Sequence, residues 1–116
     1  MSKQQIATRV VSVVPSGTIT RKRFVNFSWA QAGAGESILG VADEQIEPGI
    51  AGRVIVGETA IVESGAAING SETRLMSDAQ GRVIVWTTGN TIAGRLVRGQ
   101  TATAAGQFVE VYLFSR

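Results

Sequence analysis

The sequence contains neither cysteine nor histidine. Without cysteine the chain forms no disulfide and offers no thiolate to a metal ion. Without histidine it lacks the commonest general base and the commonest metal ligand, so neither a Ser–His–Asp nor a Cys–His arrangement is available. A Ser–Lys pair would have to use Lys3 or Lys22, and both lie near the N-terminus. These absences predict a protein that is not an enzyme.

Long hydrophobic runs are missing as well. No stretch approaches the roughly 20 apolar residues that a membrane helix needs. The first residues, Met-Ser-Lys-Gln-Gln, lack the apolar segment of a signal peptide. With 116 residues the chain has the length of one domain. We therefore expect a single domain that is made in the cytoplasm and has no membrane partner.

Runs of β-branched residues dominate what is present. They recur about every ten residues and are separated by turns rich in glycine. Apolar residues with helical spacing are nearly absent, and only residues 43–47 and 101–105 have room for a helical turn. This pattern predicts an all-β fold: a compact β-sandwich or small β-barrel with Gly-rich turns and little helix. The expected strands span residues 6–14, 23–29, 37–42, 53–56, 59–62, 82–87, 91–97 and 107–114, with weaker candidates at 66–70 and 73–76.

Local patterns refine this expectation. Gly40 interrupts an apolar strand and indicates a bulge or a close approach of another backbone. Gly57 and Glu58 separate two short β-branched runs, which predicts either a two-residue hairpin or one bulged strand. Near residue 27, apolar and polar residues alternate, so we expect Phe27 and Trp29 to lie on the core face of a half-buried strand.

The last predicted strand is apolar on both faces. Phe108, Glu110, Tyr112 and Phe114 alternate with Val109, Val111 and Leu113, so both faces are largely apolar. Such a strand lies at the centre of a sheet or is buried against a partner. Because the final strands also carry few charges, we expect the chain to form a homo-oligomer.

Charge is distributed unevenly. Five basic residues precede the first acid, Glu36, whereas the segment from Glu36 to Glu63 contains six acids and a single arginine. This asymmetry divides the chain into residues 1–23, a basic N-terminal arm or first strand, and residues 24–116, the β domain. Ordinary solvated strand faces are the alternative explanation of the charges.

Few residues offer chemistry. Asp43, Glu44 and Glu47 cluster on one short segment, but catalytic acids converge from different elements, so an exposed acidic loop is the favoured interpretation. The same carboxylates lack the regular spacing of a calcium loop. The segment Gly33-Ala-Gly35 is not followed by a phosphate-binding motif. We expect no catalytic residue, no cofactor, no metal and no small-molecule substrate.

Nucleic-acid binding has one feature in its favour. Residues 21–29 interleave basic and aromatic side chains, as the stacking surface of an OB-type barrel does. The acidic middle of the chain would repel phosphates, and a binder normally spreads positive charge over several strands. A free-standing OB-like module for nucleic acid is therefore the alternative to the function inferred next.

The order of motifs from residue 36 to residue 114 resembles the small capsid decoration (cement) proteins of tailed bacteriophages. A Val-rich strand after Pro48-Gly49 is followed by Ser77-Asp78-Ala79-Gln80-Gly81-Arg82-Val83, then Ile92-Ala93-Gly94-Arg95, then Ala105-Gly106-Gln107-Phe108-Val109-Glu110-Val111. The resemblance implies a β-rich protein on the capsid surface of a virion, bound to the major capsid protein and stabilising the head, as a homo-oligomer with a trimer favoured over a dimer. Another structural protein of the head or tail is a further alternative.

The basic N-terminal segment departs from that family pattern. We hypothesise that it contacts the capsid or a neighbouring subunit, with its β-branched run adding to a sheet edge and its cations facing an acidic shell. The alternative is that residues 6–14 form the first strand of the domain's own sheet. The candidate contact residues are Lys3, Arg9, Val11, Val13, Arg21, Lys22 and Arg23.

Overall fold

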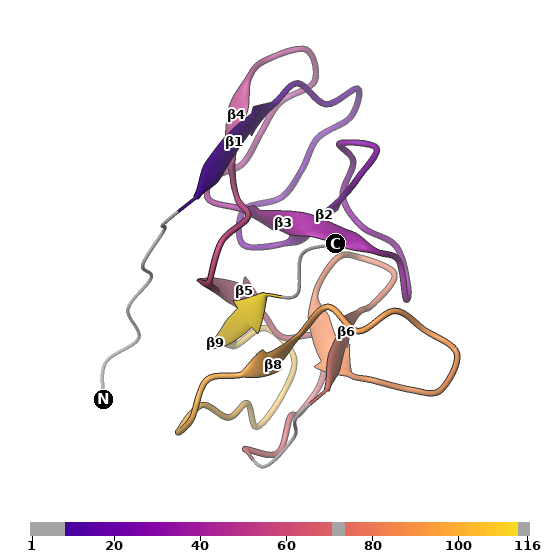
Figure 1. Cartoon of the computed structure of the whole chain (residues 1–116), viewed down its shortest axis with the longest axis vertical. Helices are drawn as coiled ribbons and strands as arrows, with labels where there is room; N and C mark the ends of the chain where they lie inside the picture. Colours follow the sequence, from indigo (N-terminus) through magenta and orange to yellow (C-terminus); the bar gives the residue numbers. More distant parts are fainter. Residues whose placement is uncertain (1–8, 71–73, 114–116) are drawn as a thin grey trace.

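The structure, a computed structural model, describes residues 9–70 and 74–113. Two antiparallel sheets form a sandwich, which confirms the predicted all-β fold (Figure 1). The described residues contain no helix, so residues 43–47 and 101–105 form no helical turn, and none of this part could cross a membrane as a helix. The strands are β1 (Val10–Val13), β2 (Phe24–Asn26), β3 (Ile38–Ala42), β4 (Gly52–Ile55), β5 (Thr59–Glu63), β6 (Leu75–Ser77), β7 (Val83–Val85), β8 (Gly94–Leu96) and β9 (Phe108–Leu113).

The first sheet has the strand order β1-β4-β3-β2. Strand β1 pairs with β4 through four residue pairs, from Val10 opposite Ile55 to Val13 opposite Gly52. The β2–β3 register shifts after Val25, which pairs with Gly40. A β-carbon at Gly40 would overlap the carbonyl oxygen of Ile55, so the predicted close approach of a neighbouring backbone is confirmed.

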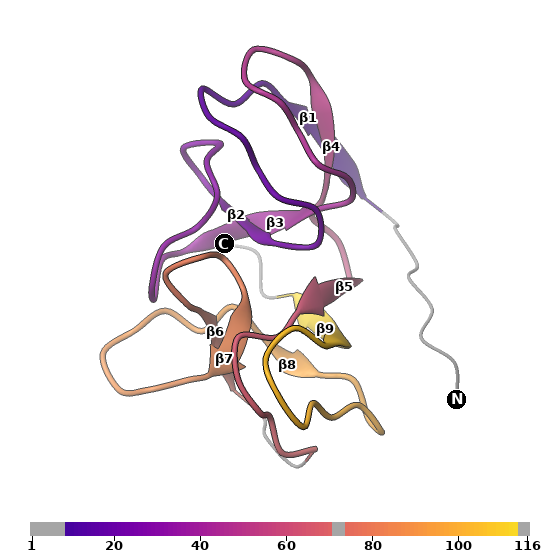
Figure 2. The same ribbon diagram turned by 180° about the vertical axis from the view of Figure 1, so that it is seen from behind.

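The second sheet has the order β5-β9-β8-β6-β7 (Figure 2). Strand β9 lies between β5 and β8, so it is a central strand, which is one of the two alternatives that its sequence predicted. The first and last strands of the sheet also meet, because Ser64 forms a parallel bridge with Val83 and the N–H of Gly65 donates to the Val83 carbonyl at 2.8 Å. This bridge curls the sheet toward closure and covers both of its edges in part.

Two apolar clusters form the core. The larger one lies between the sheets and joins Phe24, Val41 and Ile55 of the first sheet to Val62 and Val111 of the second, among others. The smaller one lies on the other face of the first sheet. The first sheet is therefore apolar on both faces. One face packs against the second sheet, and loops cover the other face. Members of this smaller cluster are Val13, Ile19, Val25, Ala42, Ile46, Val54 and Val56.

Two predictions about local structure were wrong. Gly57 and Glu58 do not form a hairpin or a bulge, because β4 and β5 belong to different sheets and these residues carry the chain between them. Glu58 turns the chain with a φ of 54°, and its carbonyl accepts from the N–H of Leu113 at 2.8 Å. Phe27 and Trp29 are not core residues, because strand β2 ends at Asn26 and both side chains are exposed.

Candidate functional site

Strand β1 is an edge of the first sheet and, within the described part of the chain, pairs only with β4. The carbonyl of Arg9 accepts from the N–H of Val56 at 3.0 Å. Because hydrogen-bonded pairs alternate along an antiparallel ladder, the backbone groups of Val11 and Val13 point toward β4, whereas those of Val10 and Ser12 point outward. Figure 1 shows β1 on the outside of the first sheet.

The other sheet edges make backbone contacts. At β2, the N–H of Phe24 donates to the Gly81 carbonyl at 2.7 Å, and the Phe24 carbonyl accepts from Ala32 at 2.9 Å. Strands β5 and β7 meet at the Ser64–Val83 bridge. Edge β1 also carries the exposed side chains of Val10 and Val11. A β-branched edge strand whose outer backbone groups are unpaired is a template for the addition of another strand.

The predicted contact residues that the structure describes separate into an exposed group and a group that is buried or paired within the chain. Arg9, Val11 and Arg21 are exposed. Val13 is fully buried in the smaller apolar cluster, and Lys22 and Arg23 form ion pairs within the chain. Lys3 lies outside the described residues. Of the predicted contact residues in residues 9–70 and 74–113, Arg9 and Val11 are thus exposed at the β1 edge, and Arg21 is exposed just before β2.

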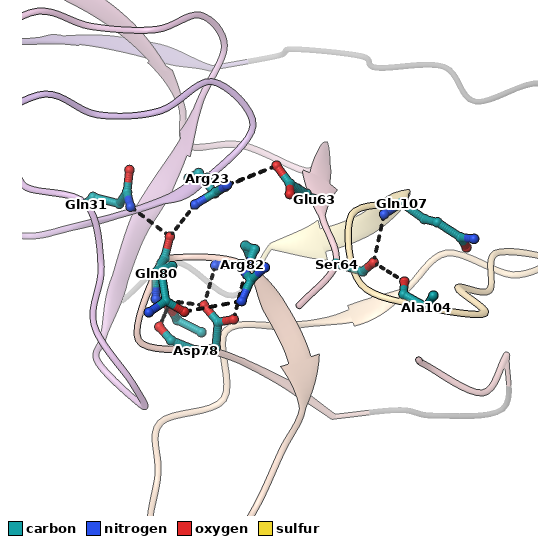
Figure 3. A network of polar contacts seen from close by, with 10 residues as sticks. Arg23, Gln31, Glu63, Ser64, Asp78, Gln80, Arg82, Ala104 and Gln107 are labelled. Atoms are coloured by element: carbon teal, nitrogen blue, oxygen red, sulfur yellow. Dashed lines mark hydrogen bonds and ion pairs between the residues drawn. The ribbon is translucent and has the colours of Figure 1, made fainter. Parts of the chain in front are cut away.

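Arg23 joins the two sheets (Figure 3). Its Nη2 lies 3.2 Å from Glu63 Oε1, and its Nη1 donates to the carbonyl of Gln80 at 2.9 Å. The same carbonyl accepts from the side-chain amide of Gln31 at 2.8 Å. Lys22 is similarly occupied, with Nζ 3.5 Å from Asp43 Oδ1. These cations stabilise the sandwich, and the basic and aromatic stretch at residues 21–29 does not present a basic stripe to a nucleic acid.

The Ser-Asp-x-x-Gly-Arg motif is a structural turn (Figure 3). The carboxylate of Asp78 accepts from the backbone N–H groups of Gln80 and Arg82 at 2.9 and 2.8 Å, and it pairs with the Arg82 guanidinium at 3.0 Å. Gly81 supplies the left-handed conformation, with a φ of 78°. The turn positions the Gln80 carbonyl to accept the hydrogen bond from Arg23, so the motif has a structural role.

The acidic residues do not converge. Asp43 lies 3.5 Å from Lys22 and 3.8 Å from Arg53, Glu47 accepts from the amide of Gln45 at 2.7 Å, and Glu44 is exposed. No group of three acids capable of holding a metal ion occurs in residues 9–70 and 74–113. The arrangement supports ion pairing within the chain.

An aromatic turn follows β2. Asn26 closes it: its side-chain carbonyl accepts from the N–H groups of Ser28 and Ala30 at 2.9 and 3.0 Å, and its own N–H donates to the Ala30 carbonyl at 2.9 Å. The turn presents Phe27 and Trp29, which are 47% and 44% exposed. Trp29 has a φ of 64°, a left-handed conformation that costs a bulky residue about 1 kcal/mol.

Glu36 supports this turn from the side. Its Oε1 accepts from the N–H of Gly33 at 2.6 Å and from the side-chain amide of Asn26 at 3.0 Å. These two hydrogen bonds, the Gly33 bond foremost, hold the pKa of the Glu36 carboxyl below its ordinary value, because both favour the charged form. The turn is therefore fixed by backbone and side-chain bonds together.

The sequence of this chain matches a known family of phage proteins. The phage cement protein family matches residues 4–113, which is nearly the whole chain. The chain belongs to the phage cement protein family. It is therefore a structural protein of a phage virion. No curated protein matches the chain.

A solved structure supports the fold of this cement-family chain. The N base of head fiber gp8.5 of bacteriophage phi29 superposes with a TM-score of 0.73 and is 16% identical in sequence, with 91% of this chain and 93% of that chain covered. At that identity the likeness concerns the fold. The same two-sheet arrangement therefore occurs in a protein of a phage head.

Sequence reasoning missed the aromatic turn. The alternation that begins at Val25 continues through Phe27 to Trp29, so it has the signature of a single strand. The available signal was Asn26, since asparagine side chains accept hydrogen bonds from backbone N–H groups two residues on and end regular structure.

Proposed function

We propose that this chain binds the outside of the phage head shell and stabilises it, and that the β1 edge is a contact with the major capsid protein. The observation that carries the proposal is membership of the cement family over residues 4–113. The β1 edge supports it, because an extended segment of a shell protein would find outward-pointing N–H and C=O groups there. Exposed Arg9 and Arg21 would steer the chain toward an acidic surface.

Single contacts of this kind are weak, since an exposed ion pair contributes about 0–1 kcal/mol. We therefore propose that the chain acts as a homo-oligomer, a trimer before a dimer, so that several edges bind at once. Phe108 and Tyr112 support self-association: they lie on the same face of β9, on the side away from the core, and are 40% and 46% exposed. Replacing both by serine should lower the mass measured by light scattering to that of a monomer; an unchanged mass would remove this face from the interface.

The β1 contact is tested by Ser12→Pro. The outward N–H of Ser12 serves no bond to β4, so proline removes an edge donor and leaves the β1–β4 ladder intact. Binding to heads that lack the protein, measured by co-sedimentation, should weaken at least tenfold while the thermal midpoint stays within about 3 °C of wild type.

Val11→Asp provides a second variant in case the proline disturbs the strand. It places a negative charge on the exposed edge and should weaken binding in the same assay. Thr18→Asp, which changes an exposed β-branched residue on the following loop, is the matched control and should bind as wild type does. Unchanged binding by both β1 variants would remove β1 from the interface.

A further inference from the structure

The aromatic turn, residues 26–30, has a property that the fold does not require. Position 29 needs a left-handed backbone, which glycine and asparagine adopt with the least strain. The chain places tryptophan there, although the side chain is 44% exposed and adds nothing to either apolar cluster. A strained residue whose side chain does not serve the fold indicates a functional contact.

The second tryptophan provides an internal contrast. The indole N–H of Trp86 donates to the Asn90 carbonyl at 2.7 Å, and the Arg74 guanidinium lies 4.7 Å from the centre of its ring. The indole N–H of Trp29 has no hydrogen-bond partner among the described residues. Trp86 therefore serves the fold, whereas the Trp29 side chain, which is 44% exposed, makes no comparable contact among the described residues.

The turn is also organised in advance. Asn26 and Glu36 fix its backbone, so little conformational freedom remains to be lost on binding. Exposed aromatic residues on such a support are the usual centres of binding energy at protein interfaces. Two exposed aromatic side chains are buried best in a concave apolar pocket, and a folded protein surface provides one.

We propose that the aromatic turn is an anchor, with Phe27 and Trp29 inserting into an apolar pocket of the head-shell protein. This inference rests on the proposed function and adds a second contact to β1. Charge favours a protein over a nucleic acid as the occupant: the turn has no cation, and the carboxylate beside it, Glu36, is held in its charged form and repels phosphates.

The test measures binding of Trp29→Asn, Trp29→Tyr and Ser28→Ala to purified heads that lack the protein. Asparagine suits the left-handed backbone, so the thermal midpoint of Trp29→Asn should equal that of wild type or exceed it by about 3 °C, while its dissociation constant rises at least tenfold. Trp29→Tyr keeps an aromatic ring and should stay within about threefold of wild type. Ser28→Ala, an exposed change in the same turn, should bind as wild type does.

The outcomes separate the anchor from the proposed function. If wild type binds heads and Trp29→Asn binds equally well, the anchor is refuted and the proposed function stands. If wild type does not bind, both fail. A loss of binding that comes with a lower thermal midpoint, or with a changed oligomeric mass, assigns Trp29 to the fold or to self-association and contradicts the anchor.

Discussion

Arg23 and Glu63 form an ion pair between the two sheets, with Arg23 Nη2 3.2 Å from Glu63 Oε1. The side chains are 16% and 20% exposed, so water screens the pair little. Arg23 lies directly before β2 and Glu63 ends β5, and the N–H of Glu63 also donates to the Lys22 carbonyl at 2.9 Å. The junction of the sheets thus depends on a cation from the basic N-terminal segment.

Arg23→Ala should destabilise the fold by about 2 kcal/mol, because it leaves the Glu63 carboxylate and the Gln80 carbonyl without their charged donor. Arg21→Ala, two residues earlier and exposed, is the matched control and should change stability by less than about 0.5 kcal/mol. Urea unfolding measures both. Equal stability of the two variants would show that the pair does not hold the sheets together.

Gly40→Ala should be among the most damaging small substitutions. A β-carbon at this position would overlap the Ile55 carbonyl and press on the Val54 side chain, so β3 and β4 would have to separate. We expect a loss of about 3 kcal/mol in the free energy of unfolding. Gly17→Ala is the control, since no atom lies within 4 Å of its β-carbon, and it should be neutral or slightly stabilising. Chemical denaturation of the two variants checks the contrast.

Local sequence patterns predicted some of these structural features, and contacts between distant residues were beyond them. The apolar faces of residues 108–113 predicted a central strand or one buried against a partner, and the interruption at Gly40 predicted a bulge or a close backbone approach. For each local pattern, one of the two alternatives is what the structure has. The partners of Lys22 and Arg23 were not predictable. Asp43 and Glu63 are distant in sequence, and only the folded topology brings them near.

The exposed site was less predictable than the fold. Residues 10–13 have a strand pattern that fits either an arm or a domain strand, and the pairing with β4 depends on residues about 40 positions away. At the aromatic turn the alternation favoured a continuing strand, and the backbone bonds of a single side chain, Asn26, decided otherwise.

The Glu36 carboxyl predicts a dependence of stability on pH. Its pKa is lower in the folded chain than in the unfolded chain, so the stabilisation it provides is fully present above the unfolded value and is lost as the pH falls through the folded value. The thermal midpoint should therefore decline between about pH 6 and pH 3, and it should decline less in Glu36→Gln.

The control for this measurement is Glu44→Gln, an exposed carboxylate on the β3–β4 loop, whose pH profile should follow that of wild type. Coincident profiles for wild type and Glu36→Gln would show that the hydrogen bonds from Gly33 and Asn26 do not favour the charged carboxylate. A steeper decline in Glu36→Gln would contradict the direction of the shift.

The stability of the head itself shows whether the chain stabilises the shell. Heads prepared without the protein are heated with and without a saturating amount of the purified chain, and the temperature at which packaged DNA becomes accessible to a dye is recorded. We predict that wild type raises this temperature by several degrees and that Trp29→Asn, at the same concentration, raises it less. An unchanged temperature on heads that are shown to carry the bound chain would contradict a stabilising role.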